Sequence, residues 1–379
     1  MNIVMKSSST LLVRMLPAAV LLFSTGALAQ TPTARAAGAK DEAIPDLRDA
    51  RVVVLRHLRI IDGTGAPAKE DQTLVIEAGK IRALGSSAAI KVPEGARTID
   101  LAGRTALPGL VMLHEHLFAW DEDSPGLAHP QHFSYPRLNL AFGVTTIRTA
   151  GTDFPYMDRN LKRRIDAGAV LGPEIHLTSP FLSGEDDPFL GTKIVRDAED
   201  ARRAVRYWAA EGFTSFKVHE WISKDALAAI LDEAHRLKLP VTAHLRSVTC
   251  REAAEMGIDN LEHGLGPCLT ADGLEEGPNG PKARALIQTL VERKVVLTAT
   301  PIRGWQPLSD LGRELLDPSA RDRYLRALSA HPARTTSPDP APHGQLLLAF
   351  ARAGGRLVLG SDPGCCGAGR VAGSPLTKR

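Results

Sequence analysis

The chain has 379 residues, a hydrophobic fraction of 44% and a formal net charge of +3 at pH 7. This length and apolar content suffice for one large domain and a smaller one. The small positive charge is spread along the sequence, without basic blocks interleaved with aromatic residues, so composition argues against a nucleic-acid partner.

The first 29 residues have the pattern of a secretory signal peptide. Lys6 and Arg14 precede an apolar stretch that ends in the small-residue motif Ala27-Leu28-Ala29, after which we expect cleavage. A retained membrane anchor is less favoured, because the apolar run is short and contains Pro17 and Gly26. We therefore expect an exported protein, periplasmic or extracellular, with no membrane association after signal cleavage.

Four cysteines follow in the mature chain, and an exported protein could oxidise them: Cys250, Cys268, Cys365 and Cys366. The sequence does not give their pairing. None lies in a C-x-x-C motif, which argues against a cysteine zinc site.

Residues 50–107 are predicted to form a small β domain, after a flexible lead-in at residues 30–49. Strand-like segments alternate with glycine turns, as in RVVVLRHLRIIDGTG and QTLVIEAGKIRALG. This pattern indicates a small antiparallel unit of the β-sandwich type.

Residues 108–362 alternate between strand-like and helical segments. The strand candidates are GLVMLHEH, VTTIRTAG, EIHLTSP, FTSFKVH, PVTAHLR, NLEHG, VVLTATP and RLVLGSD. Helical stretches lie between most of them; in one, Thr249 and Glu252 form a capping box and Gly257 ends the helix. Eight strands alternating with helices over about 250 residues predict an α/β fold, a (β/α)8 TIM-like barrel. The alternative, an open doubly wound sheet, would need a glycine-rich phosphate loop after its first strand, and LHEHLFAWDED is not one.

Metal-binding residue types recur at the ends of these strands. His114 and His116 are one residue apart, so they point to the same side of a strand. The same alternation turns further side chains into the barrel at the ends of four other strands: Lys217 and His219, His244, His263, and Asp362. A single histidine of this kind would usually be an ordinary core residue, whereas a single buried lysine is costly. Five strands that end in this way predict one site at the barrel mouth.

This constellation resembles the amidohydrolase superfamily of metal-dependent hydrolases, in its imidazolonepropionase/prolidase-like branch. The resemblance runs from about residue 50 to Asp362 and rests on PGLVMLHEH, FKVH, TAH, EHG and GSD, in that order. It implies two divalent metal ions, with zinc expected. The first ion would be held by His114, His116 and Asp362, and the second by His244 and His263. Lys217, N-carboxylated by CO2, would bridge the two.

The resemblance also implies the reaction. A secreted hydrolase of this kind cleaves an amide-like C–N bond of a small molecule, such as a dipeptide or a cyclic amide, by attack of a metal-bridged hydroxide. Asp362 would take the proton of the attacking group and pass it to the leaving amine. An ester or lactone hydrolase using the same site is an alternative.

The chain departs from the family pattern in two places. Met112 stands where the family often has an acidic residue, which removes a hydrogen-bond partner for His114. After Asp362, residues 363–379 do not have the pattern of the last helix and returning strands of the family. The second departure predicts an incomplete β domain, an irregular tail and a less stable chain that could form a homo-oligomer. It also leaves open an inactive relative that acts as a binding protein or is a non-functional product.

Four further side chains are candidates for substrate contact: Arg148, His219, Arg246 and Arg303. The arginines lie near predicted strand ends, and a guanidinium matches the geometry of a substrate carboxylate. An ordinary salt bridge would explain each of them equally well. His219 would point inward beside Lys217, where a packing role fits as well as substrate contact. We interpret His176, in the middle of its strand, as structural.

Overall fold

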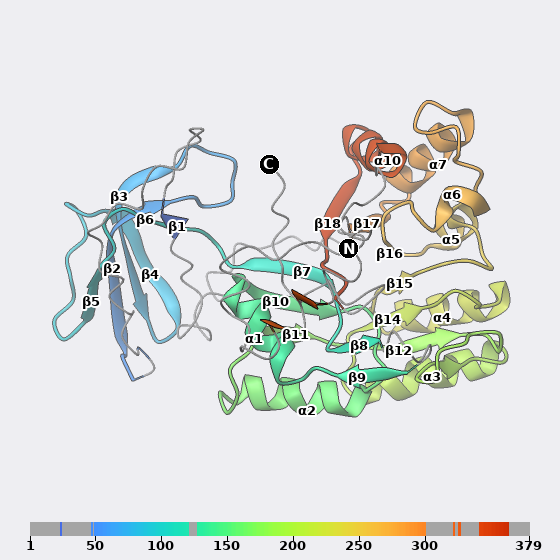
Figure 1. Cartoon of the computed structure of the whole chain (residues 1–379), viewed down its shortest axis with the longest axis horizontal. Coiled ribbons are helices and arrows are strands. Elements are labelled where there is room, and N and C mark those ends of the chain that lie inside the picture. The colour runs from blue at the N-terminus through green and yellow to red at the C-terminus, as the bar shows by residue number, and fades with distance from the viewer. Residues whose placement is uncertain are drawn as a thin grey trace. The chain divides into compact units, whose positions relative to one another are not determined.

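The computed structural model describes residues 23–24, 47, 49–120, 127–300, 321–322, 325–326 and 341–363 (Figure 1). It divides the chain into two compact units. One takes in the chain up to Leu110 together with Gly143–Thr145, and the other contains Val111–Phe142 and the chain from Thr146 onward. Apart from Phe23–Ser24, the predicted signal peptide lies outside the described residues.

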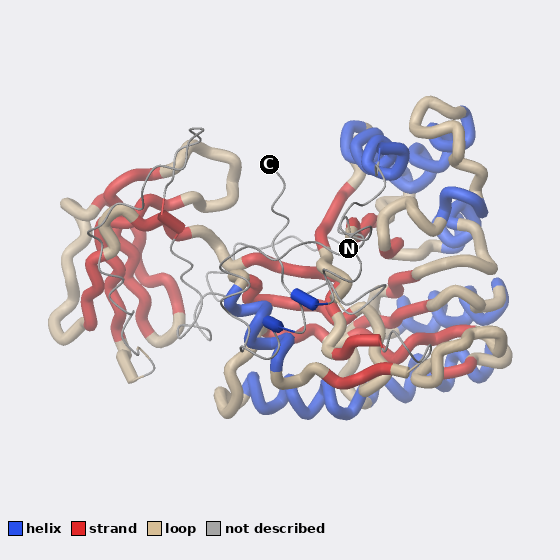
Figure 2. Tube along the Cα trace, viewed as in Figure 1, coloured by secondary structure: helices blue, strands red, loops and turns tan. Residues whose placement is uncertain are grey.

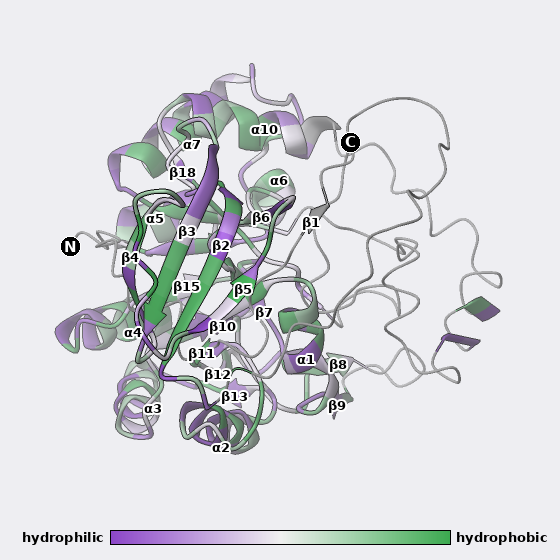
Figure 3. Cartoon of the chain, turned by 90° about the vertical axis from the view of Figure 1, so that its left-hand side faces the viewer, coloured by the Kyte–Doolittle hydropathy of each residue, from purple (hydrophilic) through white to green (hydrophobic). Residues whose placement is uncertain are grey.

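The first unit contains one six-stranded sheet. Its strands are β1 (Phe23–Ser24), β2 (Val52–Ile60), β3 (Lys69–Glu77), β4 (Lys80–Ser86), β5 (Arg97–Asp100) and β6 (Arg104–Ala106). The order is β1-β6-β2-β3-β4, with β5 also paired to β2. Apolar side chains of β2 and β3 form its core, and the apolar part of β3 is green in Figure 3.

The sheet of the first unit is mixed, so the predicted antiparallel arrangement is only partly correct. β2, β3 and β4 pair antiparallel, whereas β5 and β6 both run parallel to β2. The physical reason is that residues 87–96 carry the chain back before β5 begins. β5 and β6 then follow one another along the same edge of β2, separated by a turn in which Gly103 has a φ of 78°.

In the second unit, strands and helices alternate along the chain (Figure 2). The strands are β7 (Leu110–Glu115, which begins in the first unit), β8 (Phe118–Trp120), β9 (Ala128–Pro130), β10 (Val144–Thr149), β11 (Glu174–His176), β12 (Thr178–Ser183), β13 (Lys193–Ile194), β14 (Ser215–Val218), β15 (Val241–Ala243), β16 (Asn260–Glu262), β17 (Val296–Ala299) and β18 (Arg356–Leu359). The helices are α1 (Ser134–Ala141), α2 (Pro155–Asp166), α3 (Ala198–Ala210), α4 (Lys224–Arg236), α5 (Cys250–Met256), α6 (Cys268–Ala271), α7 (Pro281–Glu292) and α10 (Ala341–Arg352). This confirms the predicted mixed α/β class.

These strands form a seven-stranded sheet, a three-stranded sheet and the β8–β9 pair. The larger sheet has the order β13-β12-β14-β15-β16-β17-β18, and all its neighbours are parallel. The smaller has the order β11-β10-β7. Just after β18, the Asp362 N–H donates to the His114 carbonyl of β7, at 3.0 Å. The end of the last strand therefore lies against β7.

Side-chain caps fix the starts of two helices, and one of these caps was predicted from the sequence. Thr249 and Glu252 form the expected capping box at the start of α5, and Gly257 ends that helix with a φ of 101°. The start of α4 is capped by Ser223, whose side chain accepts from the Ala226 N–H. The apolar faces of these helices pack with the buried residues of β14–β17 into one continuous core. No helix in the described part of the chain is long and apolar enough to span a bilayer.

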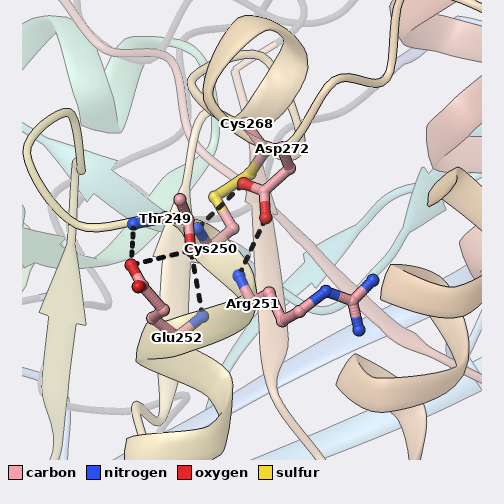
Figure 4. The surroundings of a disulfide bond; sticks show 6 residues. All are labelled: Thr249, Cys250, Arg251, Glu252, Cys268 and Asp272. Atoms are coloured by element: carbon pink, nitrogen blue, oxygen red, sulfur yellow. Dashed lines mark hydrogen bonds between the residues drawn. A yellow bond between two sulfur atoms is a disulfide. The ribbon is translucent and has the colours of Figure 1, made fainter.

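A disulfide joins Cys250 of α5 to Cys268 of α6 (Figure 4). Asp272 reinforces the same junction, because its two carboxylate oxygens accept from the Cys250 and Arg251 N–H groups, at 2.9 and 3.1 Å. The bridge thus links the segments that follow β15 and β16. Cys365 and Cys366 lie outside the described residues.

We expect the double substitution Cys250→Ser and Cys268→Ser to lower the free energy of unfolding by about 3 kcal/mol. The bridge closes a loop with a sequence separation of 18, and a loop of that size restricts the unfolded chain by about this amount. Denaturant titration against the wild type under oxidising conditions measures the loss. A change below about 0.5 kcal/mol, within the range of an ordinary surface substitution, would contradict the prediction.

Candidate metal centre

The side chains predicted as metal ligands all lie in the second unit, within β7 and β14 or just after β7, β15, β16 and β18. His114, His116, Lys217 and Asp362 are almost fully buried, at 5% exposure or less. His244 and His263 are partly buried. Buried ligands beside partly exposed ones fit a catalytic metal site, which keeps one coordination position open.

Asp362 is the point on which three of the histidines converge. Its Oδ1 lies 3.3 Å from Nε2 of His114 and 3.4 Å from Nε2 of His116. Its Oδ2 lies 3.7 Å from Nδ1 of His263. His114, His263 and Asp362 each offer a ligand atom within 4.8 Å of the others. The structure therefore brings four of the six predicted ligands together.

His244 lies beside His263 of this cluster. Its ring centroid is 4.5 Å from that of His263 and 5.3 Å from that of His219. Its Nε2 is 3.6 Å from Glu220 Oε1, and His219, Glu220 and His244 form a second group able to hold a metal. Glu220 was not predicted from the sequence, because it directly follows His219 and strand alternation would turn it away from the site.

Lys217 lies on strand β14 and is 1% exposed. Burial lowers the pKa of its amine to about 8, although the nearby carboxylates of Glu262 and Asp362 oppose this shift. A buried ammonium without a compensating role is costly. At mildly alkaline pH much of this amine is neutral and nucleophilic.

His263 and Asp362 enter the site through unusual backbone conformations. Both lie just beyond a strand and have positive φ, 61° and 50°. In β16 the side chain of Leu261 packs in the core, whereas that of Glu262 meets Thr242 of β15. Strand alternation therefore turns Glu262 inward, and His263 reaches the site by its left-handed turn instead of by the alternation expected from the sequence. Such conformations cost energy and cluster at functional sites.

Glu262 is a fully buried carboxylate that the sequence reasoning missed. Its Oε2 accepts from Nδ1 of His114 at 2.8 Å, and its Oε1 accepts from Arg148 Nη2 at 2.6 Å and from the Thr242 hydroxyl. Burial alone would raise the pKa of Glu262, but Arg148, His114 and Lys217 hold it well below its usual range. The glutamate of the EHG motif was its only sequence signal.

The carboxylate of Glu115 holds the segment that carries Asp362. Glu115, the last residue of β7, lies between His114 and His116 and is fully buried. Its Oε1 accepts from both the N–H and the hydroxyl of Ser361. Burial raises the pKa of Glu115 to about 7, although the Ser361 hydrogen bonds lower it.

The residues predicted to contact substrate have other contacts in the structure. Arg148 Nε also donates to the Leu113 carbonyl at 2.9 Å, so its guanidinium is engaged between that carbonyl and Glu262. His219 Nδ1 pairs with Asp187 at 2.8 Å. Arg246 is exposed, pairs with Glu220 at 3.0 Å and lies over the Trp221 ring.

Two more sequence candidates lie away from this cluster. Arg303 is outside the described residues. His176, interpreted as structural, is exposed, and its Nε2 lies 3.6 Å from Glu174.

The donors present fit a divalent metal. Imidazole and carboxylate are the ligands that zinc favours. Burial lowers the pKa values of His116, His244 and His263, which keeps these rings neutral with a free lone pair. Among the described residues, the buried Nε2 of His114 has no hydrogen-bond partner, although it faces Asp362. A buried polar atom of this kind calls for a ligand.

We expect Gly360→Ala to disrupt this site. A Cβ at Gly360 would lie 2.2 Å from the His114 Cβ and 2.8 Å from its backbone, so β18 and β7 would have to separate. Zinc affinity, measured by competition with a chelator, should fall at least tenfold, and the melting temperature should fall too. Gly344→Ala is the matched control, since nothing lies within 4 Å of its Cβ. Equal zinc affinity in both variants would contradict the prediction.

No protein-family model matches the chain, and no curated protein matches it in sequence. Solved structures do match in fold. A Xaa-Pro dipeptidase with bound methionine aligns at 17% identity and a TM-score of 0.59, over 84% of this chain and 81% of that one. A phenylurea hydrolase B aligns at 19% identity and a TM-score of 0.58, over 84% and 76% of the two chains. A prolidase complexed with N-methylphosphonate-L-proline aligns at 21% identity and a TM-score of 0.57, over 82% and 78%. The chain shares the fold of these proteins.

Proposed function

We propose that the protein is a metal-dependent amidohydrolase that cleaves an amide-like C–N bond of a small molecule. The observation that carries this proposal is the convergence of His114, His116 and His263 on the buried carboxylate of Asp362. Names of proteins with the same fold support the class, since they include a dipeptidase, a prolidase and a molinate hydrolase.

The site fits a (β/α)8 barrel whose strands run β7, β10, β11/β12, β14, β15, β16, β17 and β18. Support comes from the neighbour order within the two sheets and from the Asp362–His114 backbone hydrogen bond between the ends of the series. Arg148 adds a link inside the second unit, because it joins β10 to Leu113 of β7 and to Glu262 of β16. Catalytic groups at the carboxyl ends of the strands are the rule for this fold.

Two divalent ions, expected to be zinc, would be held at this mouth. His114, His116 and Asp362 would hold one, and His244 and His263 the other. When bound, such ions lower the pKa of water and polarise a substrate carbonyl.

Lys217 would bridge the two positions as a carbamate. The neutral Nζ attacks the carbon of CO2 and an N–C bond forms. One C=O π bond breaks with its electron pair moving to oxygen, and one N–H proton leaves to solvent, so the neutral amine becomes an anion with two oxygen donors. The pKa of about 8 supports this step, because a buried amine with a lowered pKa supplies the neutral form that reacts.

Asp362 would move the proton during hydrolysis. Its pKa is held well below the usual range: burial would raise it, but His114 and the other histidines stabilise the carboxylate. It is therefore ionised and able to accept the proton of the attacking water. The oxygen of that water forms a bond to the carbonyl carbon, and the same carboxyl then donates the proton to the nitrogen. The C–N bond breaks with its electron pair on nitrogen, so the products are a carboxylic acid and an amine.

Export is part of the proposal. The signal-like residues 1–29 support it, and so does the Cys250–Cys268 disulfide, because such bonds persist in oxidising compartments.

A substrate panel tests the function. The mature, zinc-loaded protein is assayed against Xaa-Pro and other dipeptides, cyclic amides, carbamates and lactones. We expect amide or carbamate hydrolysis that a chelator abolishes and zinc restores. Hydrolysis of the lactones alone would favour the ester-hydrolase alternative. A zinc-loaded protein without activity on any member would contradict the hydrolase proposal and favour an inactive binding protein.

A further inference from the structure

We infer that Glu262 is a positioning residue of the metal centre. Its carboxylate, on β16, fixes the tautomer and the orientation of His114. The inference rests on the proposed metal site. It concerns how this chain compensates for Met112, the apolar residue two positions before His114.

The contacts of His114 show which nitrogen is available. Nδ1 lies 2.8 Å from Glu262 Oε2, and a carboxylate only accepts, so Nδ1 carries the proton. Nε2 is then the nitrogen left for a metal ion: it faces Asp362 at 3.3 Å, and it would offer its lone pair to a cation bound there. A carboxylate behind a metal-ligating histidine fixes its ring and raises its basicity in this way.

Glu262 is itself held so that it cannot turn away. Its other oxygen, Oε1, accepts from Arg148 Nη2 at 2.6 Å and from the Thr242 hydroxyl. Arg148 is fixed in turn by the Leu113 carbonyl, the residue just before His114. Four strands (β7, β10, β15 and β16) therefore contribute to the placement of one imidazole.

Substitution of Glu262 by Gln tests the inference sharply. The amide oxygen can still accept from Arg148 and Thr242, which places the amide nitrogen against His114 Nδ1. An N–H donor there requires Nδ1 to accept, so the proton moves to Nε2 and the lone pair that would bind metal is lost. We expect zinc affinity, measured by chelator competition, to fall 10- to 100-fold.

Glu233→Gln is the matched control. Glu233 is also a buried carboxylate, 5% exposed, and pairs with Arg202, Arg206 and Arg236 on the surface of the second unit. Glu233→Gln changes a comparable group of ion pairs, none of which includes His114. The zinc affinity of this variant should therefore stay within twofold of that of the wild type. A loss of zinc affinity in both variants, or in neither, would overturn the inference.

A second measurement uses the wild type, in case Glu262→Gln does not fold. The ring nitrogens are 15N-labelled, and the signals of His114 in the zinc-loaded protein are assigned by comparison with His114→Asn. We expect the remaining proton on Nδ1; a proton on Nε2 would overturn the inference. Neither readout uses catalysis, so a protein that binds zinc as expected but hydrolyses nothing would contradict the proposed function and leave the role of Glu262 standing.

Discussion

Lys217→Ala is expected to lose bound metal and hydrolytic activity together. The substitution removes the group proposed to become the bridging carbamate, and alanine offers neither a donor nor a negative charge to hold two cations close together. Metal content after dialysis should fall by at least one equivalent per chain, and activity by at least about a thousandfold, the scale at which a whole catalytic group is lost. Elemental analysis and rate measurements on the same samples check both.

Rescue separates a carbamate from an ordinary structural lysine. A short carboxylic acid such as propionate should restore part of the metal and the activity to Lys217→Ala, because its two oxygens can replace those of the carbamate. In the wild type, zinc uptake with bicarbonate should be faster at pH 8.5 than at pH 6.5: the pKa is lowered to about 8, so the neutral amine increases as pH rises through that value. Lys69→Ala, at an exposed lysine of the first unit, should behave as wild type. Unaltered metal content and activity in Lys217→Ala would refute the bridging role.

Asp362→Asn is expected to lower the rate of hydrolysis by a factor of about 10² to 10⁴, the range that a general acid–base group contributes. Asparagine has nearly the same shape but cannot accept and return the proton. His114 and His116 are still present to hold metal, so activity should fall much more than metal content. Asp272→Asn, at the partly buried aspartate that caps α5, is the control and should keep the wild-type rate. An Asp362→Asn variant with more than a tenth of the wild-type rate would exclude Asp362 as the proton carrier.

The sequence predicts well what depends on neighbouring residues. Paired histidines one residue apart point to one side of a strand, and the Thr249–Glu252 box and Gly257 bound a helix through contacts within a few residues. The alternation of strands and helices predicts the α/β class for the same reason. These features follow from local backbone geometry.

What the sequence does not predict depends on contacts between distant segments. Arg148 was considered for substrate contact, but its partner is Glu262, 114 positions away. Strand alternation cannot turn both Glu262 and His263 inward. His263 enters the site through a positive φ, which the sequence does not reveal, and Glu262 therefore takes the inward position of the strand. The pairing of Cys250 with Cys268, and the parallel placement of β5 and β6 beside β2, likewise require the tertiary fold.

The metal content of the purified protein tests the central claim most directly. The disulfide-intact chain is purified without chelators, incubated with excess zinc and bicarbonate at pH 8, dialysed, and analysed for metal per chain. The account predicts close to two divalent ions per chain, and at most one in His244→Asn. A folded protein that retains no zinc with all six ligands intact would contradict it.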